Sequence, residues 1–132
     1  SRGFLVVDAS MCQCIRPCLY SAYHHIDFIK PLDFADKKSK LVDIVGPVCE
    51  SGDFLGKDRI MSVSNLLNDI KHSIYLAVMD TGAYCSSMAN NYNLHQRPAE
   101  IVIDEDETGN ASFLLTRIPD TFEYMMQQFL DN

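Results

Sequence analysis

The stretch from Gly46 to Asp53 concentrates side chains that can do chemistry: it holds a thiol, a hydroxyl and two carboxylates among two glycines and a proline. It follows the apolar run from Leu41 to Val45, which predicts a strand. Loops that are fixed to the end of a sheet commonly carry reactive groups. A thiol is mostly protonated at neutral pH, so Cys49 is suited to donate a proton to a carbanion. The alternative is an ordinary turn whose acids cap backbone N–H groups and whose cysteine is a small buried residue.

A second group of side chains is suited to binding an anion. Arg16 precedes Pro17 and offers a forked pair of donors, and Tyr20 adds a phenol four residues later. Together they suit a carboxylate, although an ordinary surface salt bridge of Arg16 is the alternative. Tyr84 follows a tight turn that ends at Gly82, so its phenol is placed either to donate to a phosphate or to pack as a half-buried aromatic.

The sequence predicts no metal site. Cys12, Cys14 and Cys18 are separated by one and three residues, whereas structural zinc sites favour paired ligands two to four residues apart. The neighbouring His24 and His25 would also point to opposite faces of a strand. We interpret these thiols as small apolar residues. A nucleophilic cysteine would need a histidine base, and no local pattern supplies one.

Composition excludes several classes of function. At 132 residues, with 47% hydrophobic and 22% charged residues, the chain has the size of one soluble globular domain. Its net charge of −7 argues against binding nucleic acid, which requires a basic surface, and no apolar run approaches the roughly 18 residues of a membrane span. Five cysteines without a secretory signal favour reduced thiols inside the cell, in the cytoplasm or a plastid.

Hydrophobic patterns predict a mostly β fold. We expect strands at 4–7, 19–29, 41–45, 74–79, 99–103 and 111–118. The first is an apolar run typical of a strand buried on both faces, and the last two form a hairpin. The chain has no helices to connect parallel strands, so we predict an antiparallel barrel or sandwich.

Two helices are predicted near the end of the chain. Residues 83–91 favour a short helix, and a final helix follows Pro119, with Asp120 and Glu123 as a capping box and Met125 and Met126 in its core. Residues 9–18 have no clean period and are predicted to be a loop, whereas residues 60–70 leave helix and loop open.

Four motifs in one order resemble the diaminopimelate decarboxylases, members of the alanine-racemase-like, pyridoxal-phosphate-dependent amino-acid decarboxylases. The motifs are Ile-Arg-Pro-x-Leu-Tyr at 15–20, Gly-Pro-Val-Cys-Glu-Ser-Gly-Asp-Phe-Leu-x-Lys-Asp-Arg at 46–59, Asp-x-Gly-Ala-Tyr at 80–84, and Ser-Met-Ala-Asn-Asn-Tyr-Asn at 87–93 with Arg-Pro-Ala-Glu at 97–100. The resemblance covers about residues 4–125. It departs at 10–14, where Ser-Met-Cys-Gln-Cys replaces the usual Gly-Met-Asn-x-Leu.

The resemblance implies a role for each candidate residue. Cys49 would be the general acid that reprotonates Cα after carbon dioxide leaves. Glu50 would contact the distal amino group of the substrate, and Arg16 and Tyr20 would hold its distal carboxylate. Tyr84 would lie at the phosphate of the cofactor and near the substrate. In such relatives two subunits share each active site, so the resemblance implies a homodimer in which Cys49 and Glu50 serve the partner's cofactor.

The resemblance also implies what these residues do not contain. The family's Schiff-base lysine lies in an N-terminal TIM barrel, and neither Lys57 nor Lys71 matches its context. We therefore expect residues 1–132 to be the C-terminal β-domain of a longer two-domain enzyme, inactive alone. The expected reaction is decarboxylation of meso-diaminopimelate to L-lysine, a step of lysine biosynthesis. The alternatives are a relative acting on ornithine, arginine or a carboxylated polyamine, where Asp usually replaces Glu50, and a non-catalytic, dimerising relative.

Overall fold

The structure is a computed structural model that describes residues 2–29, 39–62 and 74–130. These residues form two compact units, residues 1–89 (unit 1) and residues 90–132 (unit 2). The described residues of unit 1 form two short helices, Arg16–Tyr20 (α1) and Cys85–Met88 (α2), and five strands: Gly3–Val6 (β1), Ile26–Phe28 (β2), Ser39–Val45 (β3), Phe54–Ser62 (β4) and Leu76–Val78 (β5). The prediction of a mostly β fold is confirmed.

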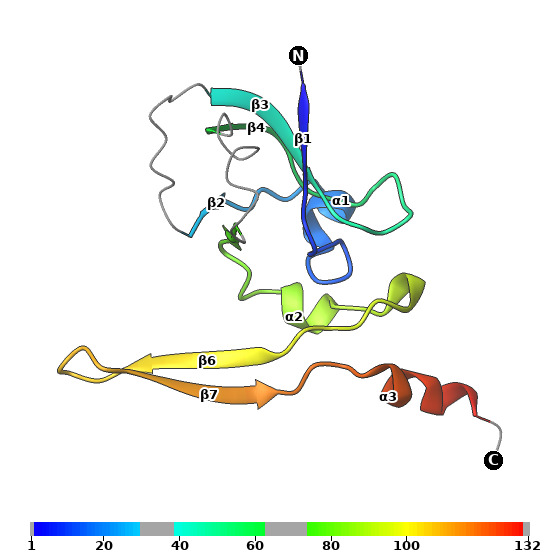
Figure 1. The fold of residues 1–132 in the computed structure, drawn as a ribbon, viewed down its shortest axis with the longest axis vertical. Coiled ribbons are helices and arrows are strands. Elements are labelled where there is room, and N and C mark those ends of the chain that lie inside the picture. The colour runs from blue at the N-terminus through cyan, green and yellow to red at the C-terminus, as the bar shows by residue number, and fades with distance from the viewer. Residues whose placement is uncertain (1, 30–38, 63–73, 131–132) are drawn as a thin grey trace. The chain divides into compact units, whose positions relative to one another are not determined.

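Strands β1, β3 and β4 lie side by side in one sheet, and β2 pairs with β5 in a second (Figure 1). Most pairs are antiparallel as predicted, but β1 runs parallel to β3, with Leu5 opposite Ile44. The strands of the described residues form separate sheets and do not close into a barrel. Strand β1 was predicted to be buried on both faces, and this is wrong: Phe4 and Val6 are exposed while Leu5 is half-buried.

The predicted strand at 19–29 is mostly wrong. Residues Arg16–Tyr20 form helix α1, because Pro17 fixes the φ angle of the first helical turn and Ser21, with φ of 54°, ends the helix in the left-handed region. Helix α1 also includes residues 16–18, the end of the segment predicted to be a loop at 9–18. Only β2 is a strand. The alternation that suggested a longer one is real, since His24 and Ile26 are buried between exposed neighbours.

The core of unit 1 lies between its sheets and α2, which spans Cys85–Met88 as predicted for 83–91. It consists of seven buried side chains: Cys14, Ile26, Val42, Ile44, Leu55, Met61 and Cys85. All five cysteines are free thiols, as predicted. Cys12, Cys14 and Cys85 are buried, whereas Cys49 is exposed.

Unit 2 contains the predicted hairpin and final helix. Its elements are Tyr92–Leu94 (η1), Glu100–Glu105 (β6), Ala111–Arg117 (β7), Phe122–Met126 (α3) and Gln127–Phe129 (η2). The predicted capping box is wrong. The hydroxyl of Thr121, one residue later than predicted, accepts the N–H of Tyr124 (3.1 Å) and caps α3. Met125 is buried as predicted, whereas Met126 is half-buried.

Asp120 instead forms a buried ion pair within unit 2. Its carboxylate accepts Nε and Nη2 of Arg97 (2.8 and 3.1 Å) and Nδ2 of Asn91 (2.8 Å). The Arg97 guanidinium holds the pKa of Asp120 well below its ordinary value, against the effect of burial. The ion pair ties residues 91–97 to the start of α3.

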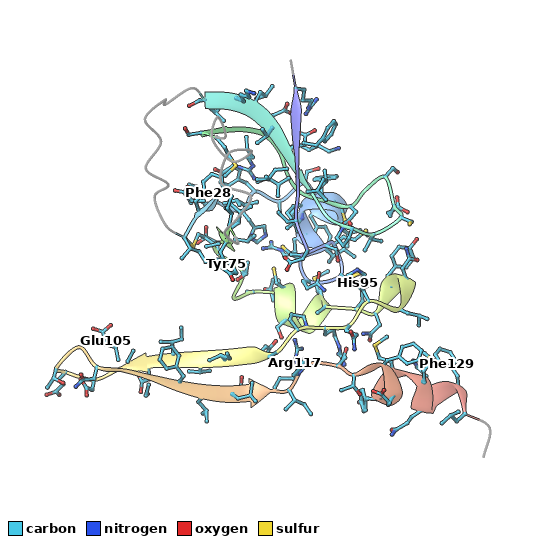
Figure 2. The ribbon with its side chains drawn as sticks, in the orientation of Figure 1. Phe28, Tyr75, His95, Glu105, Arg117 and Phe129 are labelled. Atoms are coloured by element: carbon cyan, nitrogen blue, oxygen red, sulfur yellow. The ribbon has the colours of Figure 1, made fainter. Side chains whose placement is uncertain are left out.

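Side chains project from both faces of the β6–β7 ribbon (Figure 2). Its large apolar side chains are at least half exposed: Ile101, Val102, Ile103, Phe113, Leu114 and Leu115. An isolated two-stranded ribbon is marginally stable in water, and none of the described residues of unit 2 covers these side chains. None of the described helices is long and apolar enough to cross a membrane.

Candidate functional site

The Gly46–Asp53 segment forms the loop that joins β3 to β4, as the sequence predicted. Backbone hydrogen bonds run across it from the N–H of Gly46 to the carbonyl of Asp53 (3.2 Å) and from the N–H of Asp53 to the carbonyl of Glu50 (3.0 Å). Cys49 and Glu50 lie at its tip and are exposed. The alternative in which Cys49 is a small buried residue is therefore wrong.

Asp53 is the residue that shapes this loop. Its side chain is buried, and its two oxygens accept backbone N–H groups from different segments: Oδ1 from Met11 and Oδ2 from Val48, each at 2.7 Å. Hydrogen bonds to a charged acceptor are shorter and stronger than neutral ones. The alternative in which a loop acid caps backbone N–H groups is therefore confirmed for Asp53. The same carboxylate also links the Cys49 loop to the segment that leads into α1.

Gly46 is required by a close approach in the same loop. A Cβ atom at this position would lie 2.6 Å from the carbonyl oxygen of Ala9 and 2.5 Å from Oδ2 of Asp53. Neither neighbour is free to move, because one is backbone and the other is held by two hydrogen bonds. The glycine therefore allows the loop to pack against the segment before α1.

Glu50 follows Cys49 and has a different environment from Asp53. Its Oε1 accepts the hydroxyl of Ser51 and the N–H of Gly52, both at 3.1 Å, and the residue is exposed. These contacts orient the carboxylate at the loop tip. Cys49 and Glu50 thus present a thiol and a carboxylate at the exposed tip of the same loop of unit 1.

Arg16 and Tyr84 form a second pair. The guanidinium carbon of Arg16 lies 5.8 Å from the centre of the Tyr84 ring, within cation–π range, and Nη1 donates to the carbonyl of Ala83 (3.0 Å). The Nε of Arg16 is buried and has no hydrogen-bond partner among the described residues. Because a buried donor without a partner is costly, this guanidinium retains capacity to bind an anion. The surface salt bridge considered for Arg16 does not form with any described carboxylate.

Tyr20 and Tyr84 are both exposed, with 60% and 62% of their surface accessible. Tyr20 ends α1, and Tyr84 directly precedes α2. The alternative of Tyr84 as a half-buried aromatic is therefore wrong. The structure brings Tyr84 to Arg16, whereas Tyr20 lies at the far end of the helix that Arg16 begins.

Two thiols of unit 1, those of Cys14 and Cys18, are not activated as nucleophiles. Burial, and then the neighbouring Cys85 thiol, raise the pKa of Cys14 well above its ordinary value. Burial also raises the pKa of Cys18, and the carboxylates of Asp53 and Glu50 add to this rise. A raised pKa keeps a thiol protonated and unreactive.

A cavity of about 620 Å³ in unit 1 is separate from these groups. Its lining is mainly apolar, from β1, β2, β5 and the buried Ile44 and Leu55. It contains none of the five predicted site residues. The cavity therefore belongs to the interior between the two sheets, and not to the candidate site.

Comparison with known proteins identifies the family. Residues 1–82 match the C-terminal sheet domain of the pyridoxal-dependent decarboxylases. The chain belongs to this family. It is 38% identical over 131 residues to a diaminopimelate decarboxylase of Aquifex aeolicus, covering 99% of this chain and 28% of that one. It is 43% identical over 132 residues to a probable chloroplastic diaminopimelate decarboxylase of Oryza sativa, covering all of this chain and 24% of the relative.

Solved decarboxylase structures have the same fold. The crystal structure of diaminopimelate decarboxylase from M. jannaschii superposes with a TM-score of 0.77 at 32% identity, over 98% of this chain and 26% of that one. The structure of the Helicobacter pylori enzyme in complex with L-lysine also superposes with a TM-score of 0.77, at 30% identity, over 96% of this chain and 28% of that one. The chain thus spans about a quarter of the length of these decarboxylases.

A biosynthetic arginine decarboxylase from Campylobacter jejuni shares the fold at 17% identity, with a TM-score of 0.76 over 97% of this chain. The fold is therefore common to decarboxylases of different substrates. The sheet domain itself does not identify the amino acid that is decarboxylated.

Asp53 and Gly46 shape the candidate site through long-range contacts that the sequence did not reveal. Both lie inside the motif that was recognised, but their partners, Met11 and Ala9, lie more than 35 residues earlier. The signal available in the sequence was the type and place of each residue, an acid and a glycine at the two ends of one loop.

Proposed function

We propose that this chain is the C-terminal sheet domain of a diaminopimelate decarboxylase that converts meso-diaminopimelate to L-lysine and carbon dioxide. The observation that carries the proposal is the similarity to diaminopimelate decarboxylases over nearly the whole chain. In this proposal both units belong to that one domain, and the isolated chain is inactive because the Schiff-base lysine belongs to another part of the enzyme.

Cys49 is the proton donor in this proposal. Decarboxylation leaves an electron pair at Cα, and a proton must be delivered there to complete the product. The thiol is exposed at the tip of a loop whose backbone is fixed by Asp53, so it can be placed against a substrate held outside this chain. Glu50 lies beside it and supplies a carboxylate for the distal ammonium group of the substrate.

Arg16, Tyr20 and Tyr84 bind the anionic groups. The spare Nε of Arg16 and the exposed phenol of Tyr84 form a pair of donors that fits a carboxylate or a phosphate. In the proposal Arg16 and Tyr20 hold the distal carboxylate of the substrate, and Tyr84 contacts the phosphate of pyridoxal phosphate. When bound, that cofactor supplies the electron sink for the pair left at Cα.

The enzyme is proposed to be a homodimer in which Cys49 and Glu50 serve the partner's active site. The position of both side chains at an exposed loop tip supports a role toward groups outside unit 1. The five free thiols support a reducing location, in the cytoplasm or in a plastid as the name of the Oryza sativa relative states.

The second candidate is a decarboxylase of ornithine, arginine or a carboxylated polyamine. Its support is the fold shared with the arginine decarboxylase of Campylobacter jejuni. Glu50 favours the first candidate, because the resemblance places Asp at this position in the ornithine-type relatives and Glu in the diaminopimelate decarboxylases. A non-catalytic, dimerising relative is disfavoured, since a scaffold has no need of an exposed thiol and carboxylate on a loop that is held rigid.

The test measures carbon dioxide released by the full-length enzyme from meso-diaminopimelate, ornithine and arginine in parallel. Turnover of diaminopimelate alone is expected. Cys49→Ala should lower kcat by about 10²- to 10⁴-fold, the usual contribution of a general acid. The matched control is Cys18→Ala, which removes a half-buried thiol of α1 and should leave kcat near that of the wild type.

Turnover of ornithine or arginine in place of diaminopimelate would move the protein to the second candidate. If none of the three substrates is turned over, the non-catalytic, dimerising relative would be the remaining candidate. Full activity of Cys49→Ala would overturn the role of Cys49 without changing the substrate assignment. Turnover by the isolated 132-residue chain would refute its expected inactivity.

A further inference from the structure

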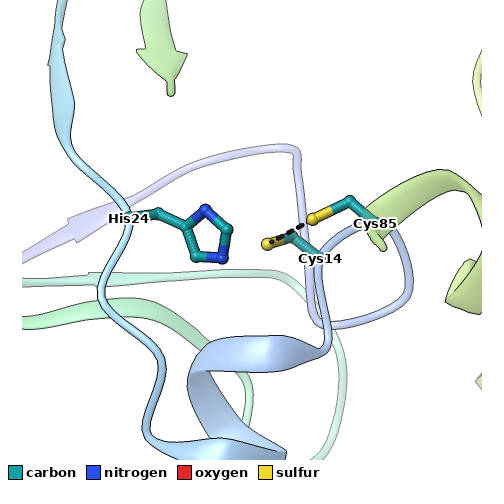
Figure 3. Close-up of side chains that lie close together, drawn as sticks. All are labelled: Cys14, His24 and Cys85. Atoms are coloured by element: carbon teal, nitrogen blue, oxygen red, sulfur yellow. Dashed lines mark hydrogen bonds between the residues drawn. The ribbon is translucent and has the colours of Figure 1, made fainter. Parts of the chain in front are cut away.

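Three side chains with metal-binding atoms meet in the interior of unit 1: Cys14, His24 and Cys85 (Figure 3). The two sulfur atoms are 3.4 Å apart, and the thiols and the imidazole nitrogen all lie within 4.8 Å of one another. In a tetrahedral site with Zn–S of about 2.3 Å and Zn–N of about 2.1 Å, such atoms are separated by roughly 3.6–3.8 Å. Small side-chain movements therefore suffice to place all three around one ion.

The imidazole of His24 supplies an independent indication. The residue is 1% exposed, and its Nδ1 lies 3.0 Å from the carbonyl oxygen of Met79. A carbonyl only accepts, so Nδ1 carries the proton and Nε2 of the neutral ring has a free lone pair. Nε2 is buried without a hydrogen-bond partner among the described residues. A histidine that donates one ring N–H to a carbonyl and presents its other nitrogen inward has the arrangement of a metal ligand.

We propose that Cys14, His24 and Cys85 form a buried site for Zn²⁺. Soft thiolate ligands select Zn²⁺ or Cu⁺ over hard cations. Two thiolates and a neutral imidazole give a neutral site with Zn²⁺ but a negative one with Cu⁺, and a buried net charge is costly. Three protein ligands leave the fourth position of a tetrahedral ion open to a small molecule such as water.

The site connects segments that are far apart in the sequence. Cys14 lies two residues before Arg16, and Cys85 directly follows Tyr84. A zinc ion would replace the weak contact between two thiols by strong bonds from α2 and from the segment before α1 to one centre. Binding should therefore stabilise unit 1. This inference concerns the fold of unit 1 and does not depend on the proposed function.

The test uses the full-length protein, reduced and freed of metal by dialysis against a chelator. Zn²⁺ affinity is measured by competition with a chromophoric chelator, for the wild type, Cys14→Ala, Cys85→Ala and Cys12→Ala. The last is the matched control, because it removes a buried thiol outside the cluster. One equivalent of Zn²⁺ should bind to the wild type and the control, and be lost in the two cluster variants.

A spectroscopic probe keeps the test independent of the variants' folding. Co²⁺ added to the metal-free wild type should give a thiolate-to-cobalt charge-transfer band that Zn²⁺ abolishes, and Zn²⁺ should raise the melting temperature. Absence of both effects would overturn the proposal. So would Zn²⁺ binding that persists in Cys14→Ala and Cys85→Ala, or a disulfide between these two cysteines in the protein isolated under reducing conditions.

Discussion

Replacement of Asp53 by asparagine should loosen the loop that carries Cys49. The carboxylate accepts two short hydrogen bonds, from the N–H groups of Met11 and Val48. An amide keeps one acceptor oxygen but turns an N–H₂ donor toward the other N–H, so one hydrogen bond is lost and its donor is left buried. A hydrogen bond to a charged group contributes about 1.5–3 kcal/mol, and an unsatisfied buried donor costs about 1–3 kcal/mol. The two costs partly describe the same loss and do not add in full, so we expect Asp53→Asn to cost about 2–4 kcal/mol in total.

The assay is hydrogen exchange followed by mass spectrometry on the full-length protein, because exchange reports the local opening of one segment. A cost of about 2–4 kcal/mol corresponds to roughly 30- to 900-fold faster exchange in peptides containing Met11 and Val48. Asp58→Asn is the control: it makes the same chemical change at an exposed carboxylate of β4, where an ion pair contributes about 0–1 kcal/mol. Unchanged exchange in Asp53→Asn would show that the carboxylate does not hold the loop.

Two further predictions concern packing and charge. Gly46→Ala places a Cβ atom 2.6 Å from the carbonyl oxygen of Ala9 and should lower the free energy of unfolding of unit 1 by about 1–3 kcal/mol, measured by urea unfolding. Gly82→Ala is the control and should be neutral, because the space around Gly82 is open. Equal effects of the two substitutions would refute the close approach at Gly46. Because the pKa of Asp120 is lowered in the folded protein, its ion pair should stabilise unit 2 fully above about pH 4, the ordinary pKa of an aspartic acid. This stabilisation should be lost as the pH falls below that value. The protection of unit 2 amides, measured relative to the intrinsic exchange rate at each pH, should therefore fall below pH 4 by more in the wild type than in Asp120→Asn, which lacks the ion pair with Arg97 at every pH. Asp106, whose pKa is also lowered, adds the same smaller loss to both proteins.

The sequence predicted elements well where one local signal acted alone. The β6–β7 hairpin has two apolar strands joined by an acidic, glycine-containing turn, and β3 is an apolar run that ends at Gly46. Predictions failed where short signals competed. Residues 19–29 alternate like a strand, but Pro17 and the left-handed Ser21 define a helix first. Strand β4 was missed because the polar residues in its centre, such as Lys57 and Asp58, mask its alternation.

The sequence supplied candidates for the site residues but not their contacts. Motifs singled out Cys49, Glu50 and Arg16 as candidates, and simple chemistry described what each side chain can do. The exposure of Cys49 and the approach of Arg16 to Tyr84 depend on how separate segments pack, which no local pattern encodes. Part of the ambiguous stretch at 60–70 lies outside the described residues, so that prediction stays open beyond β4.

The Cys49 loop separates residues that hold the structure from residues that face outward. Gly46 and Asp53 anchor its two ends against the segment before α1, while Cys49 and Glu50 between them are exposed. Changing an anchor should alter loop exchange and activity together, because a displaced thiol no longer meets its target. Changing Cys49 should alter activity alone, since an exposed thiol contributes little to packing. If Cys49→Ala destabilised the loop as much as Asp53→Asn, this division of roles would be wrong, and the motif would serve the fold before the chemistry.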